Sequence, residues 1–207
     1  MWSFLRSLWH KLGSPRWFYQ ISGQWVPWLA VLAFGLIVTG TVWGLLFAPP
    51  DFKQGNSFRI IYIHVPASML AMAGYVVMAI AGAISLIWRM KLAEVAMKCA
   101  APIGAALTFL ALVTGSIWGK PTWGTWWVWD VRVTASLVSW MIAVAYLILR
   151  RYGGPGSEKL AAGLALFGMA NVPFIYISVN YWRTIHPATS VVPTLPVSMG
   201  GPLWFCV

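Results

Sequence analysis

The chain has three histidines, and their side chains are its best candidates for binding a metal at neutral pH. His64 lies in the motif Tyr-Ile-His-Val-Pro, and His186 lies in Thr-Ile-His-Pro. His10 lies in a basic, aromatic segment near the N-terminus. Imidazole nitrogen is a common metal ligand, but a lone histidine also serves as a local hydrogen-bonding group or a solvated loop residue. The spacing alone leaves both roles open.

A cluster of tryptophans is the second feature that could bind a ligand. Residues 123–130 read Trp-Gly-Thr-Trp-Trp-Val-Trp-Asp and hold four of the 15 tryptophans. Such rings either anchor a protein among lipid headgroups or form a wall for a planar ligand. Gly119, Pro121 and Gly124 favour a short surface turn over a long helix here. Composition does not decide between anchor and wall.

The elements that must position these residues are membrane spans. The chain is 60% hydrophobic and 9% charged, with a mean hydropathy of +0.75, which excludes an ordinary soluble domain. About 20 apolar residues cross a bilayer as a helix. Five stretches without Asp, Glu, Lys or Arg are long enough: 25–47, 60–88, 99–118, 133–149 and 160–182. We therefore expect an all-α polytopic membrane protein with five complete transmembrane helices.

Basic residues indicate the orientation of these spans. The side that holds the N-terminus carries nine of them, namely Arg6, Lys11, Arg16, Arg89, Lys91, Lys98, Arg150, Arg151 and Lys159. The other side carries five, namely Lys53, Arg59, Lys120, Arg132 and Arg183. The positive-inside rule therefore places the N-terminus in the cytoplasm. The net charge of +10 is explained by membrane topology, and no nucleic acid is expected as a partner.

Three regions follow from this layout. Residues 1–24 form a basic, amphipathic cytoplasmic leader, in which we expect residues 2–12 to form a helix on the lipid surface. Residues 25–182 form the membrane domain, with the tryptophan-rich loop 119–132 on its outer face. Residues 183–207 are a proline-containing outer loop that leads into an apolar run, the start of an incomplete sixth span.

Two polar features of the spans have structural interpretations. Asp130 directly precedes the fourth span, and its carboxylate is suited to cap the first turn of that helix. Asn171 and Asn180 lie in the fifth span, where side-chain amides commonly form hydrogen bonds between helices.

The tryptophan-rich loop lies on the outer face together with His64 and His186. Haem is a ligand that this combination of side chains can bind. Two imidazoles fill both axial positions of a haem iron, and the macrocycle stacks on indole rings. The propionates require cations, and four lie on the same face: Arg59, Lys120, Arg132 and Arg183. The chain has no Cys-x-x-Cys-His motif, so the haem would be non-covalent haem b. Two histidine ligands leave no open site, which favours holding or passing haem over oxygen chemistry.

The motifs resemble those of one known family. Residues 47–57, 59–66, 101–105 and the tryptophan segment 118–132 are similar to segments of haem exporter protein C, the C component of the cytochrome c maturation system. The resemblance implies a bacterial inner-membrane protein with a six-helix bundle, of which we expect the sixth helix to be truncated in this sequence. It matches His64 and His186 to the axial ligands and matches a further set to the haem-presenting signature: Trp118, Trp123, Trp126, Trp127, Trp129 and Asp130.

The resemblance also implies a role and partners. Such proteins present haem on the periplasmic side and deliver it to a haem chaperone (component E), acting as assembly factors rather than enzymes. Further implied partners are a small single-span subunit (component D) and an ABC-type ATPase and permease (components A and B). One departure is Ala135-Ser136, which stands where the family has a Ser-Glu pair, so no role is carried over for that carboxylate.

Two other functions compete with haem delivery. A membrane b-type cytochrome would need histidines near both faces, and the chain has a usable pair on one face only. A membrane subunit of an ABC-type transporter with no haem site of its own would need polar residues along a path through the spans, and such residues are nearly absent.

Overall fold

The computed structural model of the protein describes residues 2–182 and 185–186. The regular secondary structure of this part is helical, apart from one isolated bridge between Asp51 and Gly55, and short turns and loops join the helices. Its elements are α1 (Trp2–Leu12), α2 (Pro15–Val42), the π-helix η1 (Trp43–Phe47), the 3₁₀-helix η2 (Asn56–Ile60), α3 (Ile61–Trp88), α4 (Lys91–Trp123), α5 (Val131–Tyr152) and α6 (Ser157–Tyr181). Five helical segments are long and apolar enough to cross a membrane, which confirms the predicted fold class for the described residues. The predicted sixth-span start lies outside them.

The helix boundaries differ from the expected ones at two places. Helix α2 begins at Pro15, a residue suited to the first turn, so residues 15–24 of the expected leader continue into the first span. Helix α4 runs through Gly119 and Pro121 to Trp123, so the expected short turn is confined to residues 124–130. Gly124 ends α4 because its φ of 78° suits a left-handed cap, and its N–H donates to the Lys120 carbonyl.

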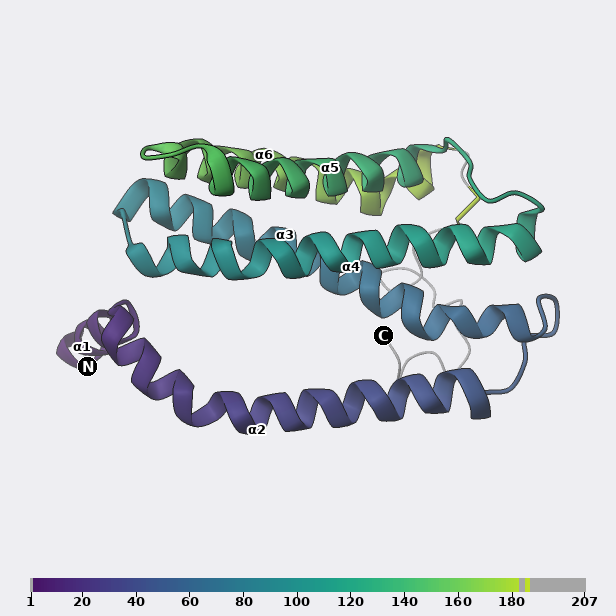
Figure 1. The fold of residues 1–207 in the computed structure, drawn as a ribbon, viewed down its shortest axis with the longest axis horizontal. Coiled ribbons are helices and arrows are strands. Elements are labelled where there is room, and N and C mark those ends of the chain that lie inside the picture. Colours follow the sequence, from purple (N-terminus) through teal and green to yellow (C-terminus); the bar gives the residue numbers. More distant parts are fainter. Residues whose placement is uncertain (1, 183–184, 187–207) are drawn as a thin grey trace.

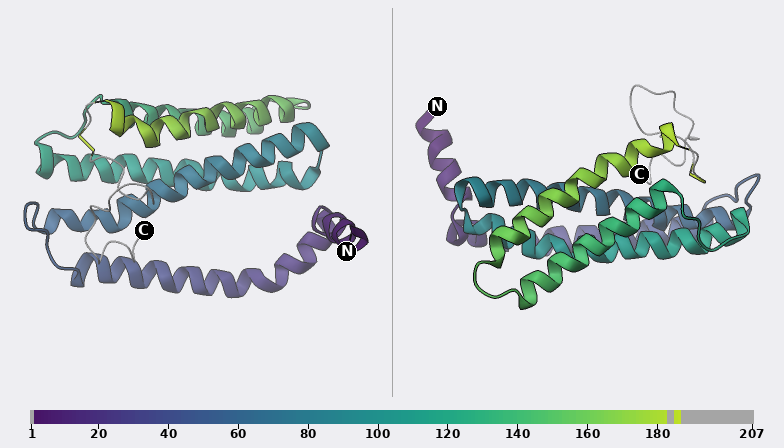
Figure 2. Two further views of the ribbon diagram at one scale, coloured as in Figure 1. Left: turned by 180° about the vertical axis from the view of Figure 1, so that it is seen from behind. Right: turned by 90° about the horizontal axis from the view of Figure 1, so that it is seen from above.

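Helices α3, α4, α5 and α6 form the packed bundle (Figure 1). Helix α2 lies beside it, contains no buried residue and meets the bundle mainly near η1 and η2 (Figures 1 and 2). The bundle core contains small residues, and Ala101, Ala161 and Ala162 are fully buried in it. Small side chains let helix backbones approach closely, which is the main source of helix association in lipid.

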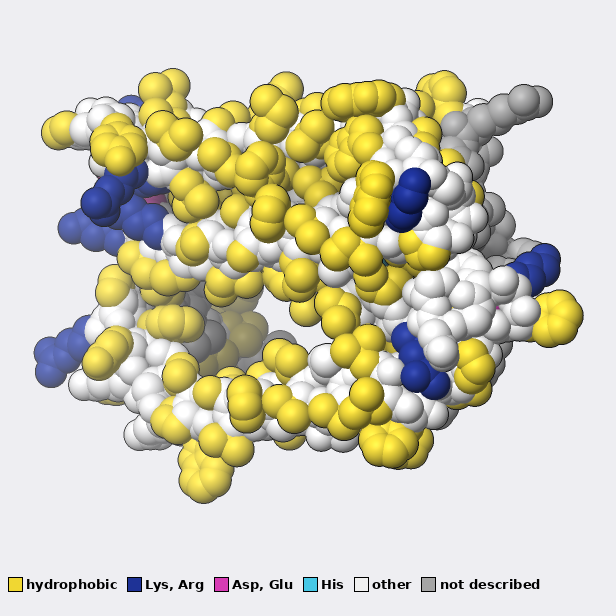
Figure 3. Space-filling view, turned by 45° about the vertical axis from the view of Figure 1, so that its right-hand side comes forward, with side chains coloured by type: hydrophobic (Ala, Val, Ile, Leu, Met, Phe, Trp, Pro, Cys, Tyr) yellow, Lys and Arg dark blue, Asp and Glu magenta, His cyan; other side chains and the backbone are white. Residues whose placement is uncertain are grey.

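The two ends of the bundle carry different segments. Helix α1 and the turns between α3 and α4 and between α5 and α6 lie at one end (Figure 1). The loop before α3, the segment 124–130 and residues 185–186 lie at the other end (Figures 1 and 2). Hydrophobic side chains cover the middle, and Lys and Arg side chains lie toward the ends (Figure 3). We call the end with the tryptophans the aromatic end.

Polar groups link three helices in the middle of the bundle. The Asn171 amide donates to the Ala135 carbonyl at 2.7 Å and to the Ser139 hydroxyl at 2.8 Å, which confirms its expected role between helices. The Tyr75 hydroxyl donates to the Ser139 carbonyl. These bonds join α3, α5 and α6, and they leave the Ser139 and Ala135 carbonyls satisfied in an apolar setting. The side chain of Asn180 lies outside the described residues.

We predict that Gly82→Leu destabilises the protein by about 1–3 kcal/mol, because overpacking a close helix contact forces the backbones apart. A Cβ atom at Gly82 would lie 3.1 Å from the Ala162 carbonyl oxygen. Gly163→Leu is the matched control, since a Cβ there meets nothing within 4 Å. Thermal unfolding in detergent measures both, and equal effects of the two changes would contradict this packing.

Candidate functional site

A cavity of about 460 Å³ lies between α3, α4, α5 and α6 and reaches the aromatic end of the bundle. This volume is typical of small-molecule sites. His64 of α3, Arg132 of α5 and His186 contribute to its lining. Four of the predicted tryptophans also line it: Trp118, Trp123, Trp126 and Trp127. The tertiary structure thus brings both candidate ligands and most of the aromatic cluster to one cavity.

His64 is held against α4 on one side of its ring. Its Nδ1 lies 3.0 Å from the Thr114 hydroxyl oxygen, and its ring packs edge-on to Trp118 with centroids 5.8 Å apart. Gly115 leaves room for the ring, because a Cβ atom there would lie 2.9 Å from Cε1 of His64. No sequence motif predicts that Thr114 and Gly115 contact His64. Only helix packing brings them to the imidazole.

Trp118 connects the outer loop to this arrangement. Its indole N–H donates to the Gln54 side-chain carbonyl at 2.7 Å, and its ring packs against Phe58 and Trp123. The loop is shaped by Asp51, whose carboxylate accepts from the backbone N–H groups of Gln54 and Lys53. These bonds lower the pKa of Asp51. Sequence analysis did not single out Gln54, because a side chain that binds across the bundle has no local sequence signal.

The segment 124–130 folds back onto the end of α4. The Ser116 hydroxyl donates to the Trp126 carbonyl, and the Lys120 ammonium donates to the Gly124 carbonyl at 3.1 Å. Trp129 is 73% exposed and packs edge-on against Trp127 with centroids 5.5 Å apart. Within the described part of the chain, the indole N–H of Trp127 is buried without a hydrogen-bond acceptor.

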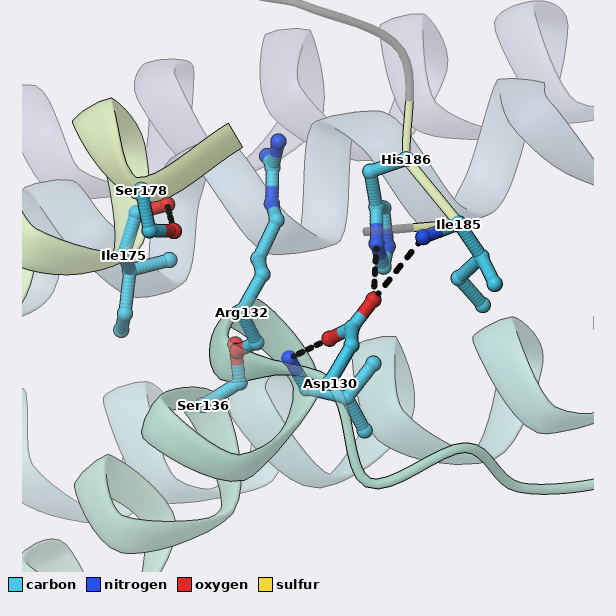
Figure 4. A network of polar contacts seen from close by, with 8 residues as sticks. Asp130, Arg132, Ser136, Ile175, Ser178, Ile185 and His186 are labelled. Carbon is cyan, nitrogen blue, oxygen red and sulfur yellow. Dashed lines mark hydrogen bonds and ion pairs between the residues drawn. The ribbon is translucent and has the colours of Figure 1, made fainter. Parts of the chain in front are cut away.

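Asp130 joins the start of α5 to the segment that carries His186. Its Oδ1 accepts from the Val133 N–H at 2.7 Å, which confirms the predicted N-cap. Its Oδ2 accepts from the Ile185 N–H at 3.1 Å and lies 3.5 Å from Nδ1 of His186 (Figure 4). Burial raises the pKa of Asp130, but the contact with His186 and the two backbone bonds outweigh it and lower the pKa to about 2. The carboxylate is therefore charged at neutral pH.

The cations that the sequence predicts for the haem propionates differ in whether they line the cavity. Arg132 lines the cavity and extends between the end of α6 and the segment of His186 (Figure 4). Arg59 of η2 instead donates to the Leu45 carbonyl at 3.0 Å and so connects η2 to η1, outside the cavity lining. Lys120 is exposed and also lies outside the lining. Arg183 lies outside the described residues.

Trp129 and Asp130 do not line the cavity themselves but contact residues that do. Ser136, at the position where the family pattern departs, contributes to the lining, and its hydroxyl donates to the Arg132 carbonyl at 2.8 Å. The described residues contain no group of three or more His, Cys, Asp or Glu side chains suited to a metal ion. Two imidazoles without further protein ligands suit a metal that brings its own equatorial ligands.

The fold and the cavity together define a polytopic helical membrane protein with an aromatic-walled site and two histidines toward one end. Comparison with known proteins gives the family. A sequence model described as Heme exporter protein C matches residues 8–207. The chain belongs to this family.

Individual relatives agree with the family match. The chain is 45% identical to Heme exporter protein C of Escherichia coli strain K12, over 98% of this chain and 82% of the relative. It is 43% identical to the protein of that name in Haemophilus influenzae, over 100% and 85% of the two chains. It is 43% identical to that of Bradyrhizobium diazoefficiens, over 87% and 69%.

The Asp130 contacts predict a pH dependence. Because its folded pKa is lowered, the stability that the carboxylate contributes is complete above about pH 4 and is lost as pH falls toward 2. Asp130→Asn keeps a capping side chain but removes the charge, whereas Asp130→Ala also removes the cap, which costs a further ~1 kcal/mol. We expect both variants to melt below the wild type at pH 7, with the alanine variant lower.

Thermal unfolding of the three proteins in detergent, from pH 7 down to pH 2, measures this difference. The gap between the wild type and Asp130→Asn should narrow as pH falls below about 4. A gap that stays constant down to pH 2 would show that the charge of Asp130 does not stabilise the fold.

Proposed function

We propose that this protein binds haem b non-covalently in the cavity, with His64 and His186 as the axial ligands, and passes it on for c-type cytochrome assembly. The observation that carries the proposal is that two imidazoles from distant parts of the chain line one aromatic cavity toward one end of a membrane bundle. Planar ligands stack on aromatic side chains, and histidine pairs are a standard haem ligand set.

The cavity residues fit this group in three respects. Gly115 leaves the space that the His64 ring occupies. The buried indole N–H of Trp127 offers a donor that no described residue accepts. Arg132 places a guanidinium at the cavity, where it can pair with a propionate. When bound, haem supplies the iron and macrocycle that c-type cytochromes require, and the chain binds and orients it.

The names of the relatives support this function. Several are called Heme exporter protein C, and a Marchantia polymorpha protein that is 42% identical over 144 residues is called a putative cytochrome c biosynthesis protein. We infer an assembly factor that delivers its cargo and does not turn over a substrate. The proposed roles of Trp118, Trp123, Trp126 and Trp127 are to wall the haem, with Trp129 backing Trp127.

We infer that the N-terminus is cytoplasmic and the aromatic end is periplasmic, in a bacterial inner membrane. Arg89, Arg150 and Arg151 lie at the end opposite the tryptophans, and the excess of basic residues belongs on the cytoplasmic side. The periplasmic haem chaperone would then approach the aromatic end, where Trp126 is 57% exposed. The single-span subunit and the ABC-type ATPase and permease remain the proposed membrane partners, with lipid around the spans.

The alternative functions have less support. For a b-type cytochrome with stacked haems, the third histidine would have to lie in the bundle near the opposite face. His10 instead lies exposed on α1, outside the packed helices. A transporter subunit with no haem site would not need two histidines in one aromatic cavity.

We predict that His64→Ala and His186→Ala each abolish the six-coordinate absorption spectrum of haem in the purified protein, because each removes one axial ligand. His10→Ala is the matched control and should keep the wild-type haem content and spectrum. Absorption spectroscopy of the detergent-purified proteins, made with and without the chaperone, measures this. An unchanged spectrum in both cavity variants would contradict the axial-ligand assignment.

A second prediction concerns orientation. In a background with Cys99→Ser and Cys206→Ser, Phe52→Cys should react with a membrane-impermeant maleimide in intact spheroplasts, because Phe52 is fully exposed on the loop of the aromatic end. Tyr152→Cys, exposed at the opposite end of α5, should react only after lysis. The reverse pattern would contradict the proposed orientation.

A further inference from the structure

Thr114 is a residue of the facing helix whose side chain forms a hydrogen bond with His64. It lies in α4, is 7% exposed, and its hydroxyl oxygen is 3.0 Å from Nδ1 of His64 in α3. The two residues are far apart in the sequence, and no motif links them. A buried hydroxyl this close to a candidate metal ligand raises the question of which atom carries the shared proton.

The other contacts of Thr114 decide the direction of this hydrogen bond. A threonine hydroxyl has one proton to donate. The oxygen of Thr114 lies 2.7 Å from the Leu110 carbonyl oxygen and 3.3 Å from that of Ala111, the back-bonding that threonine makes within a helix. Carbonyl oxygens only accept, so the proton of the hydroxyl is committed to them. Towards His64, the Thr114 oxygen therefore accepts, and the proton between the two residues belongs to Nδ1.

This assignment leaves the other ring nitrogen for a metal. In a neutral imidazole, a proton on Nδ1 leaves the lone pair on Nε2. A ligating histidine generally donates its second N–H to an outer group, which fixes the tautomer and the ring orientation. Trp118 packs on the ring edge and Gly115 lies beside Cε1, so the ring is confined in this orientation as well.

We infer that Thr114 is a positioning residue that fixes the tautomer of His64 and presents Nε2 as the iron ligand. This inference rests on the proposed haem-binding function. Thr114 does not line the cavity and acts only through His64. Losing the outer partner of a ligating histidine typically weakens metal binding by about 10–100-fold, so the effect of removing the hydroxyl is measurable.

Three variants test the role of the hydroxyl. Thr114→Val keeps the shape and removes the acceptor, whereas Thr114→Ser keeps the hydroxyl. Thr134→Val makes the same replacement on α5, outside the cavity lining, and serves as the control. Haem release from the full-length protein in detergent is measured by transfer to excess apomyoglobin. The absorption spectrum and a titration with free imidazole report whether His64 stays bound.

We expect Thr114→Val to release haem about 10–100-fold faster and to show partial loss of the six-coordinate spectrum, which added imidazole restores. Thr114→Ser and Thr134→Val should match the wild type. Wild-type release and spectrum in Thr114→Val, with only a lower melting temperature, would show that Thr114 merely packs and would overturn the inference. The same holds if Thr114→Ser behaves like Thr114→Val.

The His64→Ala variant separates this result from a failure of the proposed function. If His64→Ala loses the six-coordinate spectrum while Thr114→Val does not, only the positioning role is overturned. If His64→Ala also keeps the wild-type spectrum, the haem site itself is wrong, and the inference falls with it.

Discussion

The carboxylate of Asp130 connects two parts of the site that are distant in the sequence, the start of α5 and the segment that carries His186. One oxygen accepts from the first turn of α5, and the other accepts from the backbone at Ile185 and faces His186. A charged group in this position is costly unless its oxygens are satisfied, and both are. The start of α5 and residues 185–186 are therefore connected to each other through this carboxylate. The position of His186 at the cavity depends on this contact.

The two histidines are held by chemically different partners. His186 faces a carboxylate, and His64 donates to a neutral hydroxyl whose own proton is committed to its helix. A carboxylate places a full negative charge beside its imidazole, whereas a hydroxyl does not. Under the proposed function, the two histidine ligands therefore have different electrostatic surroundings, and the one that faces the carboxylate lies outside the helix bundle.

The aromatic cluster has two parts with different surroundings. Trp118 and Trp127 are half-buried, and the indole of Trp118 is fixed by its hydrogen bond to Gln54, whereas Trp129 is mostly exposed. A wall for a planar ligand requires fixed rings, and an anchor among headgroups requires exposed ones. Under the proposed function, the half-buried rings suit the wall, and the exposed ring of Trp129 suits contact with lipid headgroups.

The sequence alone determined the class of the fold. Uncharged stretches of bilayer length admit few structures other than helices. Asp130 directly before a span predicts a helix cap, and Asn171 within a span predicts a hydrogen bond between helices. The sequence also placed His64, His186 and the tryptophan-rich loop 119–132 on one side, because successive spans alternate in direction. The sequence could not show three hydrogen bonds: from Arg59 to the Leu45 carbonyl, from Trp118 to Gln54, and between Thr114 and His64. Those contacts join residues from different helices, and their partners are set by the rotation and packing of each helix, which hydropathy does not specify.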